Sequence, residues 1–268
     1  MITLTTQRGA REVRNLPFCY ICGNRFEVTD STNYDHVSPE SIFDIPDRNF
    51  PLKLSVHEEK CHSPMNLDDE VLGQLVALIH GKQPSERNDK LKIDIYQRTD
   101  TGVPMASFTQ RNIELLLRRW IKGFHAALYC EPLVADTKFA IQTPFPSCAA
   151  KNGHFVEDPI KEQHYKFVEC IKRNRIVSNL DCIETNNGKL RYECVWDKLN
   201  DNSWACIFSI NLYDWKDLGD INNFQPRGCA GMYSTPSGVA PKNASKATQL
   251  EFSIENSDPS DPSDPFGL

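Results

Sequence analysis

The sequence predicts an α+β fold in which a small N-terminal module precedes a helical middle segment and a C-terminal part rich in antiparallel strands. Three observations lead to this prediction. Cysteines and histidines form close pairs before residue 63, apolar residues recur at helical spacing in 110–129, and strand-like alternation begins near residue 165. The length of 268 residues exceeds that of an average domain, so a second domain or large insertions are expected.

The charge balance differs along the chain. The net charge is −6, from 30 Lys plus Arg against 36 Asp plus Glu, which argues against a protein that coats polyanions as histones do. Residues 1–72 carry 7 basic and 12 acidic side chains, 73–198 carry 19 and 15, and 199–268 carry 4 and 9. Because only the middle has a positive balance, binding to any polyanion is expected to depend on it.

The sequence contains no signal for a membrane or for secretion. No apolar run is long enough to cross a bilayer, and the N-terminal stretch MITLTTQRGAREVRN lacks the apolar segment of a signal peptide. We therefore expect a soluble, cytoplasmic protein. The ten cysteines are expected to be reduced, because they are spread through a sizeable chain without a secretion signal.

The N-terminal part is expected to hold one compact module. Residues 1–13 are polar and are expected to be flexible. The module spans 14–82, beginning with the CxxC knuckle in FCYICG and continuing through YDHVSPESIF. Its last element is expected to be a helix that ends at Gly81, since one face carries Val71, Leu72, Leu75, Val76 and Ile79.

The middle segment, 83–164, is predicted to be partly helical and partly irregular. LKIDIYQ (91–97) alternates like a strand and could form an edge of the later sheet. Residues 131–164 are rich in Pro and Gly and are expected to be irregular. Residues 110–129 are predicted to form an amphipathic helix, whose apolar face is made by Ile113, Leu116, Leu117, Trp120, Ile121, Phe124 and Leu128.

A β-rich domain is predicted for 165–234, followed by a disordered acidic tail over 235–268. Strands are expected in YKFVECIK, in RIVSNLDCIET and KLRYECVW around an Asn-Asn-Gly turn, and in SWACIFSINLYDW. The tail is rich in Pro, Ser, Asn and Asp. Too few apolar side chains remain there to offset the entropy lost on ordering.

Two close pairs of soft ligands predict a structural zinc site. Cys19 and Cys22 form one pair, and His57 and Cys61 form the other. Zinc needs about four nitrogen or sulfur ligands, usually supplied as two such pairs that the fold brings together. Such an ion contributes on the order of 10 kcal/mol to folding, which would give a module of few large apolar residues a defined shape.

A second set of polar residues accompanies these pairs. Asp35 and His36 lie between them, Asn49 follows, and His62 comes directly after Cys61. The pattern CYICG, YDHVSPESIF, NFPLKLSVHEEKCH and MNLDDE resembles the zinc-containing branch of the HNH, or ββα-metal, endonuclease family over 18–72. A weaker resemblance continues through RRWIKGFHAAL, and the β-rich remainder shows none.

The resemblance implies a role for each of these residues. His36 would be the general base, because a neutral imidazole can take a proton from water near pH 7. Asp35 and His62 would hold a divalent cation, Mg²⁺ or Mn²⁺, that binds the scissile phosphate and the leaving oxygen. Asn49 would fix its loop and the orientation of His36 through hydrogen bonds from its side chain to the backbone.

The sequence departs from the family pattern at two places. The second zinc pair usually has two intervening residues, whereas His57 and Cys61 have three, so one of these two zinc ligands could be wrong. If His62 instead completed the zinc site, Asn66, about one turn further on, could supply the ligand for the catalytic cation. Asn66 is otherwise expected to cap the following helix.

These expectations lead to an endonuclease that hydrolyses DNA, with RNA left open and a homodimer or a larger complex as its working form. A role in bacterial antiviral or other genome defence rests on analogy alone. The alternative is a zinc-stabilised subunit for nucleic-acid binding or complex assembly, whose nuclease centre is inactive or needs a partner. Phosphate contacts are expected from the basic side of the amphipathic helix, formed by Arg111, Arg118, Arg119 and Lys122.

Overall fold

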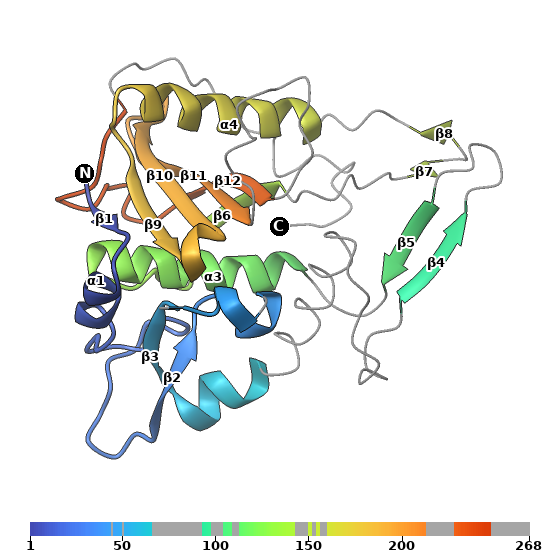
Figure 1. Cartoon of the computed structure of the whole chain (residues 1–268). Coiled ribbons are helices and arrows are strands. Elements are labelled where there is room, and N and C mark those ends of the chain that lie inside the picture. Colours follow the sequence, from blue (N-terminus) through green and yellow to red (C-terminus); the bar gives the residue numbers. More distant parts are fainter. Residues whose placement is uncertain are drawn as a thin grey trace.

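A six-stranded mixed sheet lies between two long helices, so the protein has the predicted α+β class (Figure 1). The computed structural model describes residues 1–43, 45–49, 51–65, 93–97, 104–108, 113–142, 150–151, 154–155, 160–212 and 228–247. The first strand pairs in parallel with its neighbour and the remaining pairs are antiparallel. The strand order is β1 (Thr3–Leu4), β9 (Asp181–Thr185), β10 (Leu190–Lys198), β11 (Trp204–Leu212), β12 (Gly228–Ser234) and β6 (Lys138–Gln142).

The two faces of the sheet pack against different helices. Helix α3 (Ile113–Tyr129) covers one face, where Phe124 stacks on Tyr192 of β10 at 4.6 Å between ring centroids. Helix α4 (Ile160–Ile176) covers the other, where a second apolar cluster joins it to Val195. Alternate residues of a strand point to opposite faces, which explains why β10 is buried on both sides. Among the described residues, none of the helices combines the length and the apolar character that a bilayer-spanning segment needs.

Helix α4 corrects one prediction, because YKFVECIK was expected to be a strand. Phe167 and Ile171 lie four residues apart and are both buried in the cluster with Val195. That spacing puts them on one face of a helix. A short apolar run is compatible with a strand or a helix, and here the charged residues that follow it continue the helix to Ile176.

The predicted Asn-Asn-Gly turn is present between β9 and β10. Asn186 and Asn187 both have φ near 55°, and Gly188 has φ of 76°. Asparagine and glycine tolerate this left-handed conformation better than other residues. The turn sets the register in which Thr185 pairs with Leu190.

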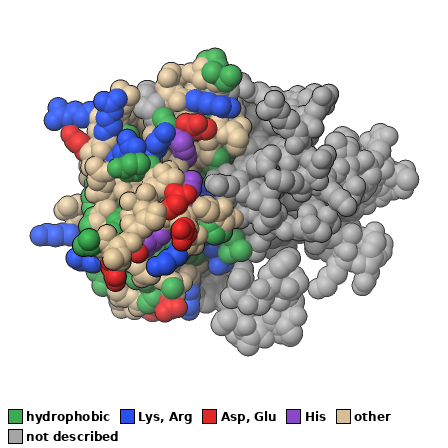
Figure 2. All heavy atoms as spheres, turned by 90° about the horizontal axis from the view of Figure 1, so that it is seen from below, with side chains coloured by type: hydrophobic (Ala, Val, Ile, Leu, Met, Phe, Trp, Pro, Cys, Tyr) green, Lys and Arg blue, Asp and Glu red, His purple; other side chains and the backbone are tan. Residues whose placement is uncertain are grey.

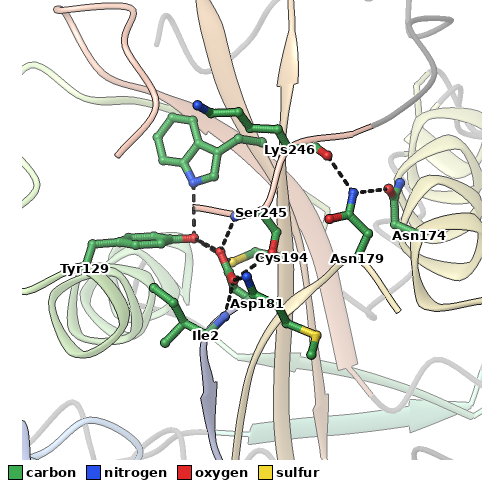
Figure 3. Close-up of polar contacts among 10 residues, drawn as sticks. Ile2, Tyr129, Asn174, Asn179, Asp181, Cys194, Ser245 and Lys246 are labelled. Carbon is green, nitrogen blue, oxygen red and sulfur yellow. Dashed lines mark hydrogen bonds and ion pairs between the residues drawn. The ribbon is translucent and has the colours of Figure 1, made fainter. Parts of the chain in front are cut away.

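Asp181 explains why two segments that were expected to be flexible are ordered (Figure 3). Its buried carboxylate accepts hydrogen bonds from the backbone N–H of Ile2 at 2.6 Å, from the Tyr129 hydroxyl at 2.9 Å and from Ser245 N and Oγ at 2.8 Å each. A buried carboxylate needs such donors to offset its desolvation. Asp181 therefore joins the N-terminal segment, α3 and the segment near Ser245.

The N-terminus and the start of the acidic tail accordingly differ from prediction. Residues 1–13 contain β1 and the helix α1 (Gln7–Glu12), whose first turn is capped by the Thr6 side chain. Residues 235–247 run along the sheet. The backbone N–H of Trp196 donates to Ser245 O, and the backbone N–H of Ala247 donates to Trp196 O. Residues 248–268, the rest of the predicted tail, lie outside the described residues.

Short strands occur in the middle segment. The strand predicted at 91–97 is present as β4 (Ile93–Gln97), but it pairs with β5 (Pro104–Phe108) and not with the six-stranded sheet. The stretch expected to be irregular contains β6 as well as β7 (Ala150–Lys151) and β8 (His154–Phe155). The helix predicted around Val71 lies outside the described residues.

The N-terminal module lies on the side of α3 that faces away from the sheet (Figure 1). Its antiparallel hairpin joins β2 (Thr32–His36) to β3 (Lys53–His57), and a π-helical turn, η3 (Glu58–His62), follows. Three short 3-10 turns complete it: η1 (Glu40–Ile42), η2 (Ile45–Asp47) and η4 (Ser63–Met65). A Cβ atom at Gly123 would come within 2.6 Å of Val37, so glycine allows α3 to approach the end of β2. One apolar core runs from the hairpin through α3 to the sheet.

Candidate metal centre and the groups beside it

Cys19, Cys22, His57 and Cys61 converge on one point, as their pairing in the sequence predicted. Their ligand atoms all lie within 4.8 Å of one another. His57 Nδ1 is 3.5 Å from Cys22 Sγ and 3.9 Å from Cys61 Sγ. These four residues are therefore close enough to bind a metal ion.

The local backbone explains how each pair is presented. The amide of Cys19 donates to Asn24 O at 2.9 Å and the amide of Gly23 donates to Cys19 O at 2.8 Å, which closes the knuckle into a turn. Gly23 has φ of 80°, a conformation that favours glycine. In the second pair, His57 ends β3 and Cys61 lies in η3, whose π-helical bonds join residues five apart. This wider turn accommodates the three residues between the two ligands.

The donor set fits a structural metal ion. Three sulfur atoms and one imidazole nitrogen are donors that Zn²⁺ prefers in closed tetrahedral sites. Burial raises the pKa of the Cys61 thiol, and the neighbouring Cys19 and Cys22 raise it further. A metal ion bound here would supply the positive charge that favours the Cys61 thiolate at neutral pH.

Asp30 is a part of this centre that the motif did not reveal. His57 Nε2 lies 3.2 Å from Asp30 Oδ2, so the carboxylate accepts from the ring nitrogen that faces away from the sulfurs. The backbone N–H of Glu27 also donates to Asp30 at 2.8 Å. This bond and the His57 imidazole lower the pKa of Asp30. A carboxylate in this place fixes the tautomer and the orientation of a metal-binding histidine.

Replacing Asp30 with asparagine should therefore weaken metal binding by about 10- to 100-fold, the usual effect of losing such a partner. Release of the metal ion to a chromophoric chelator measures this change. The same substitution at the exposed Asp136, after α3, is the matched control and should leave metal release unchanged. Equal release from both variants would show that Asp30 does not support His57.

Asp35 lies in a buried network with Tyr20 and Arg119. The carboxylate is 2% exposed, and the Tyr20 hydroxyl donates to its Oδ2. Arg119 Nη2 lies 3.1 Å from Oδ2 and 3.3 Å from Oδ1. Burial and the charge of Asp35 raise the pKa of Tyr20, so its hydroxyl remains a donor. The network joins α3 to β2 across 84 residues of sequence.

The burial of Arg119 differs from the prediction that this side chain faces solvent and contacts phosphate. Arg119 is 4% exposed and pairs with Asp35, so its side chain does not face solvent.

Lys122 donates to Ile21 O at 3.0 Å, beside the metal centre. Burial lowers the pKa of Lys122, and the nearby thiol groups oppose this effect. Arg118 lies over the Phe139 ring at 5.3 Å, and Arg111 lies outside the described residues. Arg119 and Lys122 hold α3 against the module.

His62 contacts Asp35, and His36 follows Asp35 directly in the sequence. His62 Nδ1 is 3.4 Å from Asp35 Oδ1, and this buried nitrogen has no hydrogen-bond partner within the described part of the chain. His36 Nε2 is 2.7 Å from Glu40 Oε1, a close contact that is not aligned as a hydrogen bond. Burial and the Lys53 charge lower the pKa of His36, while Glu40 and Asp35 oppose them. His36 is thus neutral near pH 7.

Asn49 contacts its own loop and the sheet. Its side chain donates to Pro46 O at 3.2 Å and to Asn187 Oδ1 at 3.4 Å. Its carbonyl accepts from the amide of Asn186 at 3.2 Å. These bonds hold the loop in place, but the side chain in contact with His36 is Glu40. The alternative ligand Asn66 lies outside the described residues.

Comparisons with known proteins identify no relative of this chain. No family model, no curated protein and no solved structure matches the chain. The function must therefore be inferred from the chemistry of the residues themselves.

Proposed function

We propose that this protein is a metal-dependent endonuclease of the HNH type, which hydrolyses phosphodiester bonds of DNA. In this proposal the Cys19, Cys22, His57 and Cys61 site holds structural zinc, and Asp35 and His62 hold a catalytic Mg²⁺ or Mn²⁺. The observation that carries the proposal is the buried His62 Nδ1, which lacks a hydrogen-bond partner among the described residues and lies 3.4 Å from Asp35 Oδ1.

The distance between these two atoms suits a shared cation. Two ligands bound at roughly 2.1 Å, with an angle between 90° and the tetrahedral value, lie about 3.0–3.4 Å apart. The Tyr20 hydroxyl donates to Asp35 Oδ2, and Arg119 contacts both carboxylate oxygens. Oδ1 is the oxygen that also faces His62 Nδ1. A cation bound there would supply Lewis-acid stabilisation of the phosphate and the leaving oxygen.

His36 is the group that would move a proton. A neutral imidazole near pH 7 can take a proton from the attacking water. Glu40, at 2.7 Å from Nε2, can orient the ring and stabilise the imidazolium that forms. The other ring nitrogen, Nδ1, then accepts the proton of the water. His36 is the last residue of β2 and directly follows Asp35. The proposal requires the base and the cation to act on the same phosphate at this end of the strand.

The test is plasmid cleavage by the zinc-loaded protein with added Mg²⁺ or Mn²⁺. His62→Ala should reduce the cleavage rate by roughly 100-fold or more, since the cation loses a ligand. Zinc content should stay unchanged, because His62 is not one of the four clustered residues. Ser63→Ala, at the exposed neighbouring position, is the control and should cut like the wild type.

Two outcomes would contradict the proposal. Equal cleavage by His62→Ala and wild type would remove His62 from the reaction. A wild type that binds DNA but never cuts it with either cation would favour the zinc-stabilised binding or assembly subunit.

A further inference from the structure

Two cations, Arg14 and Lys53, lie on the face of the hairpin that carries His36 and Tyr34. In the antiparallel register His36 pairs with Lys53, and Tyr34 pairs with Ser55. Directly opposed residues point to the same face of a sheet, and alternate residues along a strand share a face. These four side chains therefore lie on one face, whereas Asp35 points to the other, where it is buried.

Arg14 reaches the same face from the far edge of β3. Its carbonyl accepts from Ser55 N at 3.2 Å and from Ser55 Oγ at 3.1 Å, so its backbone runs beside β3. Its guanidinium carbon lies 3.6 Å from the centre of the Tyr34 ring. The Arg14 side chain thus crosses β3 above the small Ser55. The Tyr34 hydroxyl donates to Asn15 at 2.8 Å, which holds the ring in place.

The part of the chain that the structure describes offers neither cation a carboxylate partner. Within the described ranges, Arg14 and Lys53 form no ion pair with a carboxylate, and Arg14 Nε is buried without a hydrogen-bond partner. By contrast, Arg8 on α1 pairs with Glu12 at 2.8 Å. Seen from below in Figure 2, from the side on which β2 and β3 lie in Figure 1, basic and acidic side chains are interspersed in the described part. Anion binding there would depend on a few cations and not on a broad positive field.

We propose that Arg14 and Lys53 form a binding surface for the phosphodiester backbone of a nucleic-acid strand. This inference rests on the proposed function and names the residues that hold its substrate. Lys53 lies about 5 Å across from His36, and Tyr34 lies about 7 Å along the strand, a spacing on the scale of neighbouring phosphates. The Tyr34 ring holds the guanidinium in place, and this planar group can present its N–H groups to a phosphate as a fork.

Binding of a fluorescein-labelled DNA duplex, measured by anisotropy at several salt concentrations, tests this surface. The zinc-loaded protein is used without Mg²⁺, so that binding is separated from cleavage. Arg14→Gln and Lys53→Gln should each weaken binding by about threefold to tenfold at low salt. Each should also reduce the slope of log Kd against log salt by about 0.9, the effect of losing one phosphate contact.

Arg8→Gln is the matched control, because it removes the same charge from a side chain that is already paired and should leave Kd and slope unchanged. If Arg14→Gln lowers the melting temperature and so disturbs the fold, the result with Lys53→Gln decides the test. Lys53 is half-exposed and makes no ion pair with a described residue, so its replacement should leave the fold unchanged. Single-stranded DNA and RNA probes show which nucleic acid the surface prefers.

The outcomes separate this surface from the proposed nuclease activity. Binding that depends on Arg14 and Lys53, without cleavage when either Mg²⁺ or Mn²⁺ is added, would support the surface and overturn the nuclease. If the wild type cleaves DNA, and Arg14→Gln and Lys53→Gln both bind DNA as tightly as Arg8→Gln does, the surface would be overturned and the nuclease left intact.

Discussion

Cys19→Ser should remove the bound metal ion and unfold the hairpin module. Cys19 is fully buried, and its sulfur is one of the four clustered ligand atoms. A structural zinc ion contributes on the order of 10 kcal/mol to folding, which is comparable with the stability of an entire domain, about 5–15 kcal/mol. Hydrogen exchange should show lost protection of the β2 and β3 amides, and metal analysis should show less than one zinc per chain.

The central strands provide an internal comparison for this variant. Strands β10 and β11 are paired at nine positions in antiparallel register. Helix α4 packs on one of their faces through an apolar cluster whose described members include no hairpin residue. The protection of the β10 and β11 amides should largely survive. Cys130→Ser, at the exposed thiol that follows α3, is the matched control. Normal zinc content and normal protection in Cys19→Ser would contradict the assignment of the metal centre.

The metal centre could be predicted because its signal is local in the sequence. Each ligand pair lies within five residues, and soft ligands at that spacing have few other uses. The Asn-Asn-Gly turn and the helix of α3 could be predicted for the same reason, since a turn type and a helical periodicity are properties of short segments.

Contacts between distant segments could not be predicted in this way. Arg119 was expected on the solvent side of its helix, because the charged side of an amphipathic helix, opposite its apolar face, usually faces solvent. The fold instead places it against Asp35, 84 residues earlier. Likewise, Ile2 is ordered by Asp181, 179 residues away. Asp30 lies outside the quoted segments, and Glu40 lies within YDHVSPESIF but was assigned no role. Only their distances to His57 and His36 identify them.

His36→Ala should lower DNA cleavage by roughly 10²- to 10⁴-fold, the usual contribution of a general base. The fold should survive, since His36 ends β2 and no hydrogen bond of its ring nitrogen Nε2 to the described residues is lost. Thr32→Ala, at an exposed position of the same strand, should cut like the wild type. Plasmid cleavage in Mg²⁺, with zinc content measured alongside, compares the three proteins.

The pH dependence of the same reaction identifies the proton acceptor. Because burial and the Lys53 charge lower the pKa of His36, its neutral form persists below the ordinary pKa of histidine, near 6.5. The acidic decline of wild-type cleavage, where the imidazole becomes protonated, should therefore have its midpoint below that value. The residual activity of His36→Ala should lack this decline, because the group that takes the proton is gone. An unchanged acidic decline in the variant would assign the proton transfer to another residue.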